Sequence, residues 1–334
     1  TDVTWKAADG YSLGSTGPPA NTSWGTASVP LPADVASGAT VTFAFNVTIP
    51  TVVGPYNFQW QMTGPGNVPF GQTSPATLVN VVAAGPPNYQ GLWWKAPGGS
   101  ENGWGINFAH QGRVIFGTWF TYDTTGKGWW LTLITETTPS PGVYTAGLYA
   151  TTGPPFNAVP FVKTSSANKV GTATLNFTDA SNGTFHYEVT LPGGTVSQTK
   201  AITQQQLAAP PLASCASATT PLTGATNYQD IWWGGTSASP GTEQGWGINF
   251  THQGDLIFAS WFTYDLDGTP LWVVAIAPKT APGVYKGDLY RPSGPRFDAY
   301  DKNQWNANPS VGSLTLTFAD GNNATMDYTV QLAN

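Results

Sequence analysis

The sequence is poor in the residues that build internal cross-links and reactive centres. It contains a single cysteine, Cys215, which excludes an internal disulfide framework and any cysteine-based metal site. Only 12 Lys and Arg stand against 18 Asp and Glu, and charged residues make up 9% of the chain, where an ordinary soluble domain has about 25%. Because nucleic-acid binding needs a basic surface, this composition argues against nucleic acid as a partner.

Long apolar runs and strong helix formers are also scarce. No apolar stretch approaches the roughly 18 residues of a membrane-spanning helix, so we expect no membrane span. In their place the 334 residues include 39 Gly, 28 Pro, 15 Trp, 13 Tyr and 16 Phe. Gly and Pro disfavour helices, and the aromatic content is too high for a disordered chain. The composition therefore predicts an all-β protein.

The composition also bears on localisation. Low charge with abundant Thr, Ser, Asn and Gly fits an extracellular setting better than a cytosolic one. The sequence starts at Thr1 without a methionine, as a secreted protein does after removal of its signal peptide. We therefore expect a secreted or cell-surface protein. In an oxidising compartment, Cys215 is a candidate for a disulfide between two chains.

Most of the sequence is one duplicated unit. The segment Gly103–Phe108 (GWGINF) returns as Gly245–Phe250, and Trp119–Asp123 (WFTYD) returns as Trp261–Asp265. Self-similarity at a fixed offset indicates two copies of one domain. The predicted organisation is a first domain over 1–84, repeat one over 88–205, a Pro/Ala/Ser/Thr-rich linker over 206–226 and repeat two over 227–334.

The first domain contains segments in which apolar and polar residues alternate, as in half-buried strands. Three tryptophans and several short motifs make it resemble the immunoglobulin-like four-tryptophan domain, known from selective-autophagy receptors and secreted bacterial proteins. The pieces that carry this resemblance are Trp5, Tyr11–Leu13, Trp24-Gly25, the predicted strand 41–50 and Tyr56–Met62. The resemblance implies an Ig-like β-sandwich of about 80 residues that serves as a spacer or binding module rather than a catalyst.

Each repeat predicts up to eight strands joined mostly by short turns. The strands expected in repeat one are 89–96, 102–109, 113–122, 128–135, 142–151, 170–178, 183–191 and 195–203. Such a succession is typical of an up-and-down antiparallel sheet, and closing it into a barrel removes its edges. The tandem repeats resemble Trp-rich repeats of secreted proteobacterial proteins, with an avidin-like strand count. That likeness concerns the fold and does not identify a ligand.

The hairpin 103–122 can be predicted residue by residue. A turn at 110–113 places Trp104 opposite Trp119 on the face expected to fill the barrel. Repeat two predicts the same pairing at the equivalent positions. These tryptophans are therefore expected in the barrel core.

Repeat two is predicted to lack one strand. At an offset of 141, Leu332 aligns with Leu191, and no counterpart of the strand 195–203 follows. Two strands would then have a free edge. The linker could fold back into the gap, the sheet could stay open, or another chain could donate a strand. Donation between copies would be head-to-tail and would produce fibres unless it closes into a ring.

Acidic residues recur at equivalent positions near the ends of two strands. Glu101 and Asp123 are predicted to lie almost opposite each other, as are Glu243 and Asp265. A carboxylate pair can serve glycoside hydrolysis or bind Ca²⁺, but Asp followed by Gly is also an ordinary turn sequence. All three interpretations remain open.

Adjacent tryptophans on one strand must point to opposite faces, so one of each pair points away from the core. The outward candidates are Trp94 and Trp130 in repeat one, with Trp233 and Trp272 as their equivalents. Outward aromatic rings can stack on sugars, contact another protein or be covered by a neighbouring domain.

We therefore expect a non-catalytic, extracellular structural or adhesive surface protein that assembles with other copies of itself by strand donation or head-to-tail contacts. The alternative is a secreted carbohydrate-binding protein that uses Trp94, Trp130, Trp233 and Trp272 on an extracellular glycan. A third hypothesis is a glycoside hydrolase. No cofactor is expected.

Overall fold

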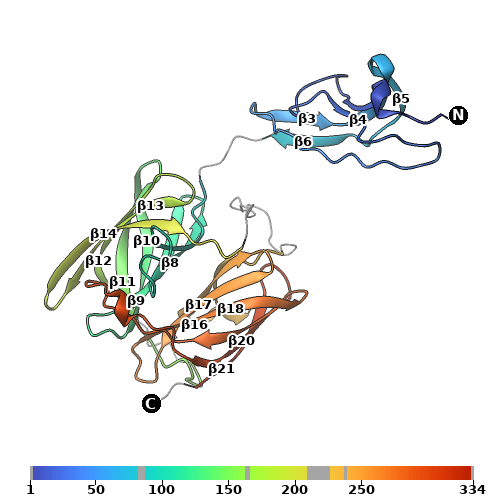
Figure 1. Cartoon of the computed structure of the whole chain (residues 1–334). Coiled ribbons are helices and arrows are strands. Elements are labelled where there is room, and N and C mark those ends of the chain that lie inside the picture. The colour runs from blue at the N-terminus through green and yellow to red at the C-terminus, as the bar shows by residue number, and fades with distance from the viewer. Residues whose placement is uncertain (1–2, 82–86, 162–165, 209–225, 237–238, 332–334) are drawn as a thin grey trace. The chain divides into compact units, whose positions relative to one another are not determined.

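The structure, a computed structural model, describes residues 3–81, 87–161, 166–208, 226–236 and 239–331. The chain divides into two compact units, Thr1–Pro86 and Pro87–Asn334, and both repeats belong to the second unit. Regular structure is almost entirely β (Figure 1), which confirms the predicted fold class. The helical elements of the described residues are the 3-10 turns η1 (Ala7–Asp9), η2 (Pro65–Asn67) and η4 (Lys302–Gln304).

Within the described ranges, no helix combines the length and the apolar character that crossing a bilayer requires.

The N-terminal unit, residues 1–86, is built from two small antiparallel sheets. One has the order β2-β1-β4-β5, and the other pairs β3 with β6. The strands are β1 (Ser12–Ser15), β2 (Ser28–Pro30), β3 (Gly54–Phe58), β4 (Trp60–Gly64), β5 (Val68–Thr73) and β6 (Thr77–Val81).

The prediction of a strand over 41–50 is wrong, because these residues belong to no sheet. Within this segment, the Thr48 amide donates to the Trp24 carbonyl at 2.9 Å, and no other backbone amide of the segment donates to a backbone carbonyl. The alternating pattern has a different origin. The ring of Phe45 packs on Trp60 at 4.9 Å between ring centroids, so an extended chain covers the aromatic core with alternate residues without forming a ladder.

Repeat one forms a closed eight-stranded barrel in which each strand pairs antiparallel with its neighbours in sequence (Figure 1). Its strands are β7 (Gly91–Lys95), β8 (Gly105–Gln111), β9 (Val114–Tyr122), β10 (Gly128–Ser140), β11 (Val143–Thr152), β12 (Ser166–Phe177), β13 (Asn182–Leu191) and β14 (Gly194–Gln204). The last strand, β14, pairs with β13 over ten residues and closes the barrel by pairing three residues with β7.

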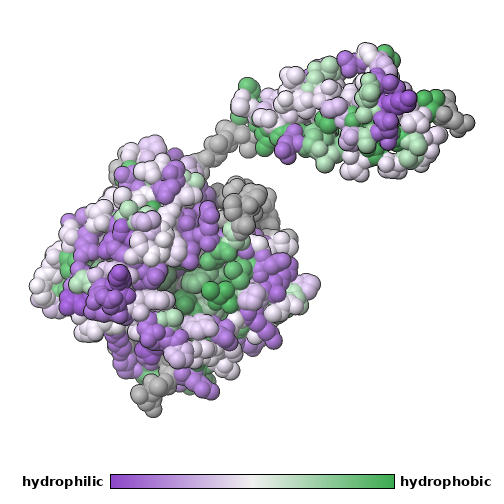
Figure 2. All heavy atoms as spheres, viewed as in Figure 1, coloured by the Kyte–Doolittle hydropathy of each residue, from purple (hydrophilic) through white to green (hydrophobic). Residues whose placement is uncertain are grey.

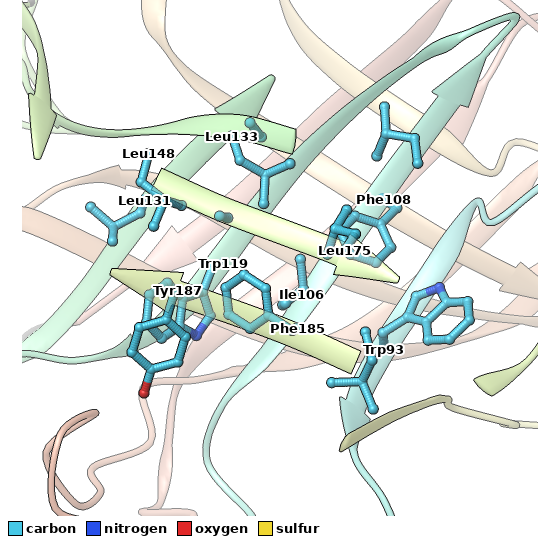
Figure 3. Close-up of a cluster of buried hydrophobic side chains, with 14 of the residues drawn as sticks. Trp93, Ile106, Phe108, Trp119, Leu131, Leu133, Leu148, Leu175, Phe185 and Tyr187 are labelled. Atoms are coloured by element: carbon cyan, nitrogen blue, oxygen red, sulfur yellow. The ribbon is translucent and has the colours of Figure 1, made fainter. Parts of the chain in front are cut away.

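The inside of this barrel is filled with side chains. Figure 3 shows large aromatic and aliphatic residues from several strands meeting in the interior. Trp93, Trp119, Phe185 and Tyr187 are all buried there. Interiors packed in this way have few voids larger than a water molecule, so this part of the barrel is core rather than a ligand cavity.

The predicted register of the β8–β9 hairpin is wrong by two residues. Ile106 lies opposite Trp119, where Trp104 was expected. The reason is the turn, because Gly112 has φ +64° and takes the first loop position, which favours glycine. The loop therefore lies one residue later than predicted. A shift of two residues leaves every side chain on its predicted face, so Trp104 still points into the barrel end.

The described residues of repeat two form a curled sheet of seven strands that does not close (Figure 1). Its strands are β15 (Asp230–Thr236), β16 (Ser239–Gln253), β17 (Leu256–Tyr264), β18 (Pro270–Ala281), β19 (Val284–Tyr290), β20 (Ser310–Phe318) and β21 (Ala324–Val330). Among the described residues, β15 and β21 each have a strand on one side only. No described strand of repeat two corresponds to β14.

Candidate functional site

The outer faces of the two repeats meet through a repeated tryptophan contact. The indole of Trp130 donates to the carbonyl of Thr263 at 3.0 Å, and the indole of Trp272 donates to the carbonyl of Thr121 at 2.9 Å. Trp130 and Trp272 are equivalent residues, so the contact is made twice with approximate two-fold symmetry. Their exposed fractions are 4% and 3%.

This burial corrects the prediction that Trp130 and Trp272 are ligand-binding aromatics. Both side chains point out of their own sheet, as predicted, but the other repeat covers them. Burial under a neighbouring domain was one of the open alternatives. Strand periodicity predicted on which face of its sheet each tryptophan lies, but it did not predict which part of the protein covers that face.

The two repeats also exchange loops. The segment Gly153–Ala158 (GPPFNA) of repeat one and the equivalent Gly294–Ala299 (GPRFDA) of repeat two carry Phe156 and Phe297. Phe297 packs within the core of repeat one, and Phe156 packs against the core of repeat two. Neither phenylalanine was predicted from the sequence as a contact between the repeats. Their signal was the repeated Gly-Pro-x-Phe-x-Ala motif.

Each exchanged loop is fixed by the same backbone hydrogen bond. The amide of Phe297 donates to the Tyr122 carbonyl at 2.9 Å, and the amide of Phe156 donates to the Tyr264 carbonyl at 2.9 Å. The Phe297 ring lies 5.8 Å from that of Trp119. The loop of repeat two that carries Phe297 thus closes one end of the repeat-one barrel. The cavity left at this end is only about 10 Å³, on the order of a single water molecule.

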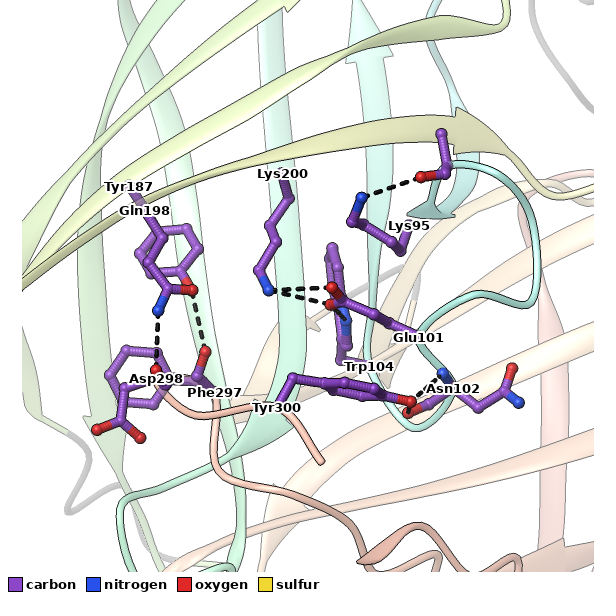
Figure 4. A network of polar contacts seen from close by, with 11 residues as sticks. Lys95, Glu101, Asn102, Trp104, Tyr187, Gln198, Lys200, Phe297, Asp298 and Tyr300 are labelled. Carbon is purple, nitrogen blue, oxygen red and sulfur yellow. Dashed lines mark hydrogen bonds and ion pairs between the residues drawn. The ribbon is translucent and has the colours of Figure 1, made fainter. Parts of the chain in front are cut away.

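Polar residues at this closed end of the repeat-one barrel form a network rather than an open cleft. Figure 4 shows Lys200 paired with Glu101, whose carboxylate also accepts from the Trp104 indole at 2.9 Å. The Lys200–Glu101 distance is 3.0 Å. Tyr300, which follows the exchanged loop, accepts from the Asn102 amide at 2.8 Å. The Tyr300 contact joins the segment that follows the loop of repeat two to the barrel of repeat one.

The predicted carboxylate pair of repeat one makes two separate sets of bonds. Glu101 bonds Lys200 and Trp104, whereas Asp123 accepts from the amides of Thr125 and Lys127 within its own turn. The turn interpretation of Asp123 therefore agrees with the bonds that it makes.

In repeat two, Asp265 forms an ion pair with Arg291 at 2.6 Å, and Glu243 accepts from the Trp246 indole at 3.1 Å. No cluster of three His, Cys, Asp or Glu occurs in the described part of the chain. The suggested Ca²⁺ positions Glu101, Asp123, Glu243 and Asp265 are therefore not gathered into such a cluster.

Two equivalent histidines are buried as structural hydrogen-bond acceptors. The Nδ1 atom of His110 accepts from the Tyr89 amide at 3.1 Å, and that of His252 accepts from the Tyr228 amide at 3.0 Å. Burial lowers the pKa of both imidazoles below the usual value, because the charged form loses its hydration. Each histidine thus fixes the start of its repeat in the neutral state.

The open side of repeat two exposes residues whose counterparts are buried in repeat one. Tyr328 on β21 is 40% exposed, whereas its equivalent Tyr187 on β13 is 1% exposed. Met326 is half-buried, whereas Phe185 is fully buried. In repeat one, β14 covers these positions. The exposure in repeat two therefore agrees with the finding that β20 is the only described strand beside β21.

The remaining tryptophan candidates, Trp94 and Trp233, lie on the equivalent strands β7 and β15. Trp94 on β7 faces Thr203 of β14 and is half-buried. Its equivalent Trp233 lies on β15, has no described strand at that side and is 59% exposed. Trp233 is thus the most accessible of the four predicted aromatic candidates.

A second surface feature lies on the outer face of repeat two. Figure 2 shows apolar residues gathered over β17 and β18. A groove there is lined by Phe258, Val274, Ile276 and Trp305, with the charged residues Lys286 and Asp288 along the lining. It is an accessible, mainly apolar surface.

Comparison with models of known protein families finds no match, and comparison with curated proteins finds none either. The disulfide candidate Cys215 lies outside the described residues, as does most of the predicted linker 206–226.

Proposed function

We propose that this protein is a non-catalytic structural or adhesive component outside the cell, joined to a neighbouring polypeptide by β-strand addition at repeat two. The observation that carries the proposal is that, among the described residues, β15 and β21 each pair with a strand on one side only. Unpaired edges present rows of backbone donors and acceptors that template another strand.

Repeat one supports the proposal because its strand β14 has no counterpart among the described strands of repeat two. There β14 pairs with ten residues of β13 and three of β7. An added strand in repeat two would form the equivalent ladders and cover Tyr328 and Met326. Each backbone hydrogen bond contributes about 1 kcal/mol net, so a ladder of this length can hold two chains together.

Self-assembly is the form of this function that we propose. A strand contributed by a second copy makes a heterologous contact, which repeats head to tail. The low content of charge, with a net charge of −6 over 334 residues, leaves little electrostatic repulsion between copies. In such an assembly the N-terminal unit serves as a spacer or binding module, in line with its resemblance to the four-tryptophan domain.

The test compares the full chain with a self-complemented variant. In the variant, residues 194–204 are appended after Asn334, so that repeat two receives a copy of β14 from its own chain. We expect size-exclusion chromatography with light scattering to find assemblies of the full chain and monomers of the variant. A scrambled appendix is the control and should leave assembly intact. A full chain that stays monomeric at high concentration overturns self-assembly.

A carbohydrate-binding function is the second candidate, favoured by the 59% exposure of Trp233. Exposed indole rings stack on sugar faces, and Trp305 adds a second accessible ring on repeat two. Polysaccharide pull-down with Trp233→Ala and Trp94→Ala tests it. Unchanged retention of both variants removes this candidate.

A further inference from the structure

The ion pair at the end of the repeat-one barrel joins its closing strand to the rest of the sheet. Glu101 accepts from the Nζ of Lys200 at 3.0 and 3.2 Å while holding the Trp104 indole (Figure 4). The two charged side chains are 16% and 15% exposed. Lys200 belongs to β14, so the closing strand supplies the cation.

Repeat two contains the acidic half of the same arrangement. Glu243 corresponds to Glu101 and accepts from the Trp246 indole at 3.1 Å, as Glu101 does from Trp104. Glu243 forms no ion pair with any described residue, and its side chain is exposed. A carboxylate held in the same way, beside the gap in the sheet, lacks the amine that β14 provides in repeat one.

A second polar contact of the closing strand also has no counterpart among the described residues of repeat two. In repeat one, the Tyr187 hydroxyl donates to the Gln198 side chain at 2.8 Å, and the Gln198 amide donates to the Asp298 carbonyl at 2.8 Å. In repeat two, the equivalent hydroxyl of Tyr328 contacts the Phe156 carbonyl at 3.4 Å. The exchanged loop is therefore present, whereas no described residue supplies the side-chain amide that β14 supplies in repeat one.

The register of repeat one places these groups on a strand. On β14, Gln198 faces Tyr187 and Lys200 faces Phe185, with Val196 and Ile202 pointing to the same side. The equivalents of Tyr187 and Phe185 on β21 are Tyr328 and Met326. Positions two residues apart share a face of a strand, so the order of these inward residues on β14 defines the order that a strand added beside β21 needs.

We infer that repeat two accepts a strand whose inward residues run aliphatic, amide, Lys or Arg, aliphatic, with the amide opposite Tyr328 and the cation paired with Glu243. This inference rests on the proposed strand addition and specifies the chemistry of the partner. A strand with an acidic residue at the cation position is rejected, because two carboxylates in a partly desolvated site repel each other.

The test uses the full chain and two synthetic peptides. One is residues 195–203 (TVSQTKAIT), and the other carries the substitution Lys200→Glu. Binding is measured by calorimetry at low salt. We expect the lysine peptide to bind at least tenfold more tightly, with the difference shrinking at high salt. In the Glu243→Lys chain the preference should reverse, and in Glu243→Gln it should disappear.

The reversal locates binding at repeat two, because Glu101 is unchanged in every chain. Glu243 is exposed and forms no ion pair among the described residues, so its replacement by Lys removes the hydrogen bond from the Trp246 indole but should keep the fold, which thermal melting checks. If both peptides bind equally to all three chains, strand addition stands and the cation requirement is overturned. If neither peptide binds, and the self-complemented variant assembles like the full chain, the proposed function fails as well.

Discussion

Phe156 and Phe297 occupy the same position in the two repeats, and each packs into the sheet of the other repeat rather than its own. Phe297 lies 5.8 Å from Trp119, and Phe156 lies 6.0 Å from Trp261, measured between ring centroids. Each hydrophobic core therefore contains a residue from the other repeat. This exchange explains why the two repeats form one compact unit.

The first prediction concerns this exchange. Replacing Phe297 by Ala should lower the free energy of unfolding by about 3 kcal/mol, since the ring is buried in the core of repeat one. Phe156→Ala should cost less, because Phe156 is half-buried. Urea unfolding followed by tryptophan fluorescence measures both. Separate transitions for the two repeats, with Phe297→Ala affecting only one of them, would contradict the shared core.

The second prediction separates the buried from the exposed tryptophans. Trp272→Ala should destabilise the protein by about 3–5 kcal/mol, because it removes a buried ring and the hydrogen bond to Thr121. Trp233→Ala, at a 59% exposed position, should change stability by less than about 0.5 kcal/mol. Thermal and urea unfolding give both values. Equal losses would mean that the interface between the repeats is not as described.

The third prediction compares equivalent acids. Glu101→Gln should cost about 1–2 kcal/mol, between the values for exposed and buried ion pairs, because Glu101 and Lys200 are mostly shielded from solvent. Glu243→Gln should be nearly neutral, since the described residues supply no cationic partner. The comparison is made on unfolding free energies at two salt concentrations. A large loss for Glu243→Gln would reveal a partner in the isolated chain.

The fourth prediction concerns pH. Burial lowers the pKa of His110 and His252 in the folded protein, whereas both titrate near 6.5 when unfolded. Below about pH 6.5 the unfolded chain binds more protons than the folded chain, so stability falls as pH decreases. The double variant His110→Asn/His252→Asn, which retains an acceptor near Nδ1, should flatten this decline. An unchanged pH profile of the melting temperature would count against the assignment.

Much of the architecture was predictable because the pattern of apolar residues and the duplication reinforce each other. The eight strands of repeat one follow the alternation in sequence. The alignment of Leu332 with Leu191 predicted a repeat two without a counterpart of β14, and the described strands of that repeat number seven. The hairpin register was wrong by two residues because the position of Gly112 in its turn was misjudged. The predicted face of each side chain in the hairpin was still correct, since side chains two residues apart on a strand point to the same face.

Contacts between the repeats were not predictable in the same way. Periodicity identifies which side of a strand Trp130 and Trp272 occupy, but it does not identify what covers them. The loops bearing Phe156 and Phe297 have no periodic pattern, so only their repetition in sequence marked them. In the N-terminal unit, the alternation over 41–50 reflected packing on Trp60 rather than sheet pairing.

The loop exchange has a consequence for the chain as a whole. The loop that packs into the core of each repeat belongs to the other repeat. Cleavage within residues 209–225 would therefore yield complementary fragments rather than two independent domains. Mixed together, such fragments should recover the native fluorescence, while either one alone should leave an aromatic interior open to solvent. The connection between the repeats then acts as a tether that raises the local concentration of two mutually dependent halves.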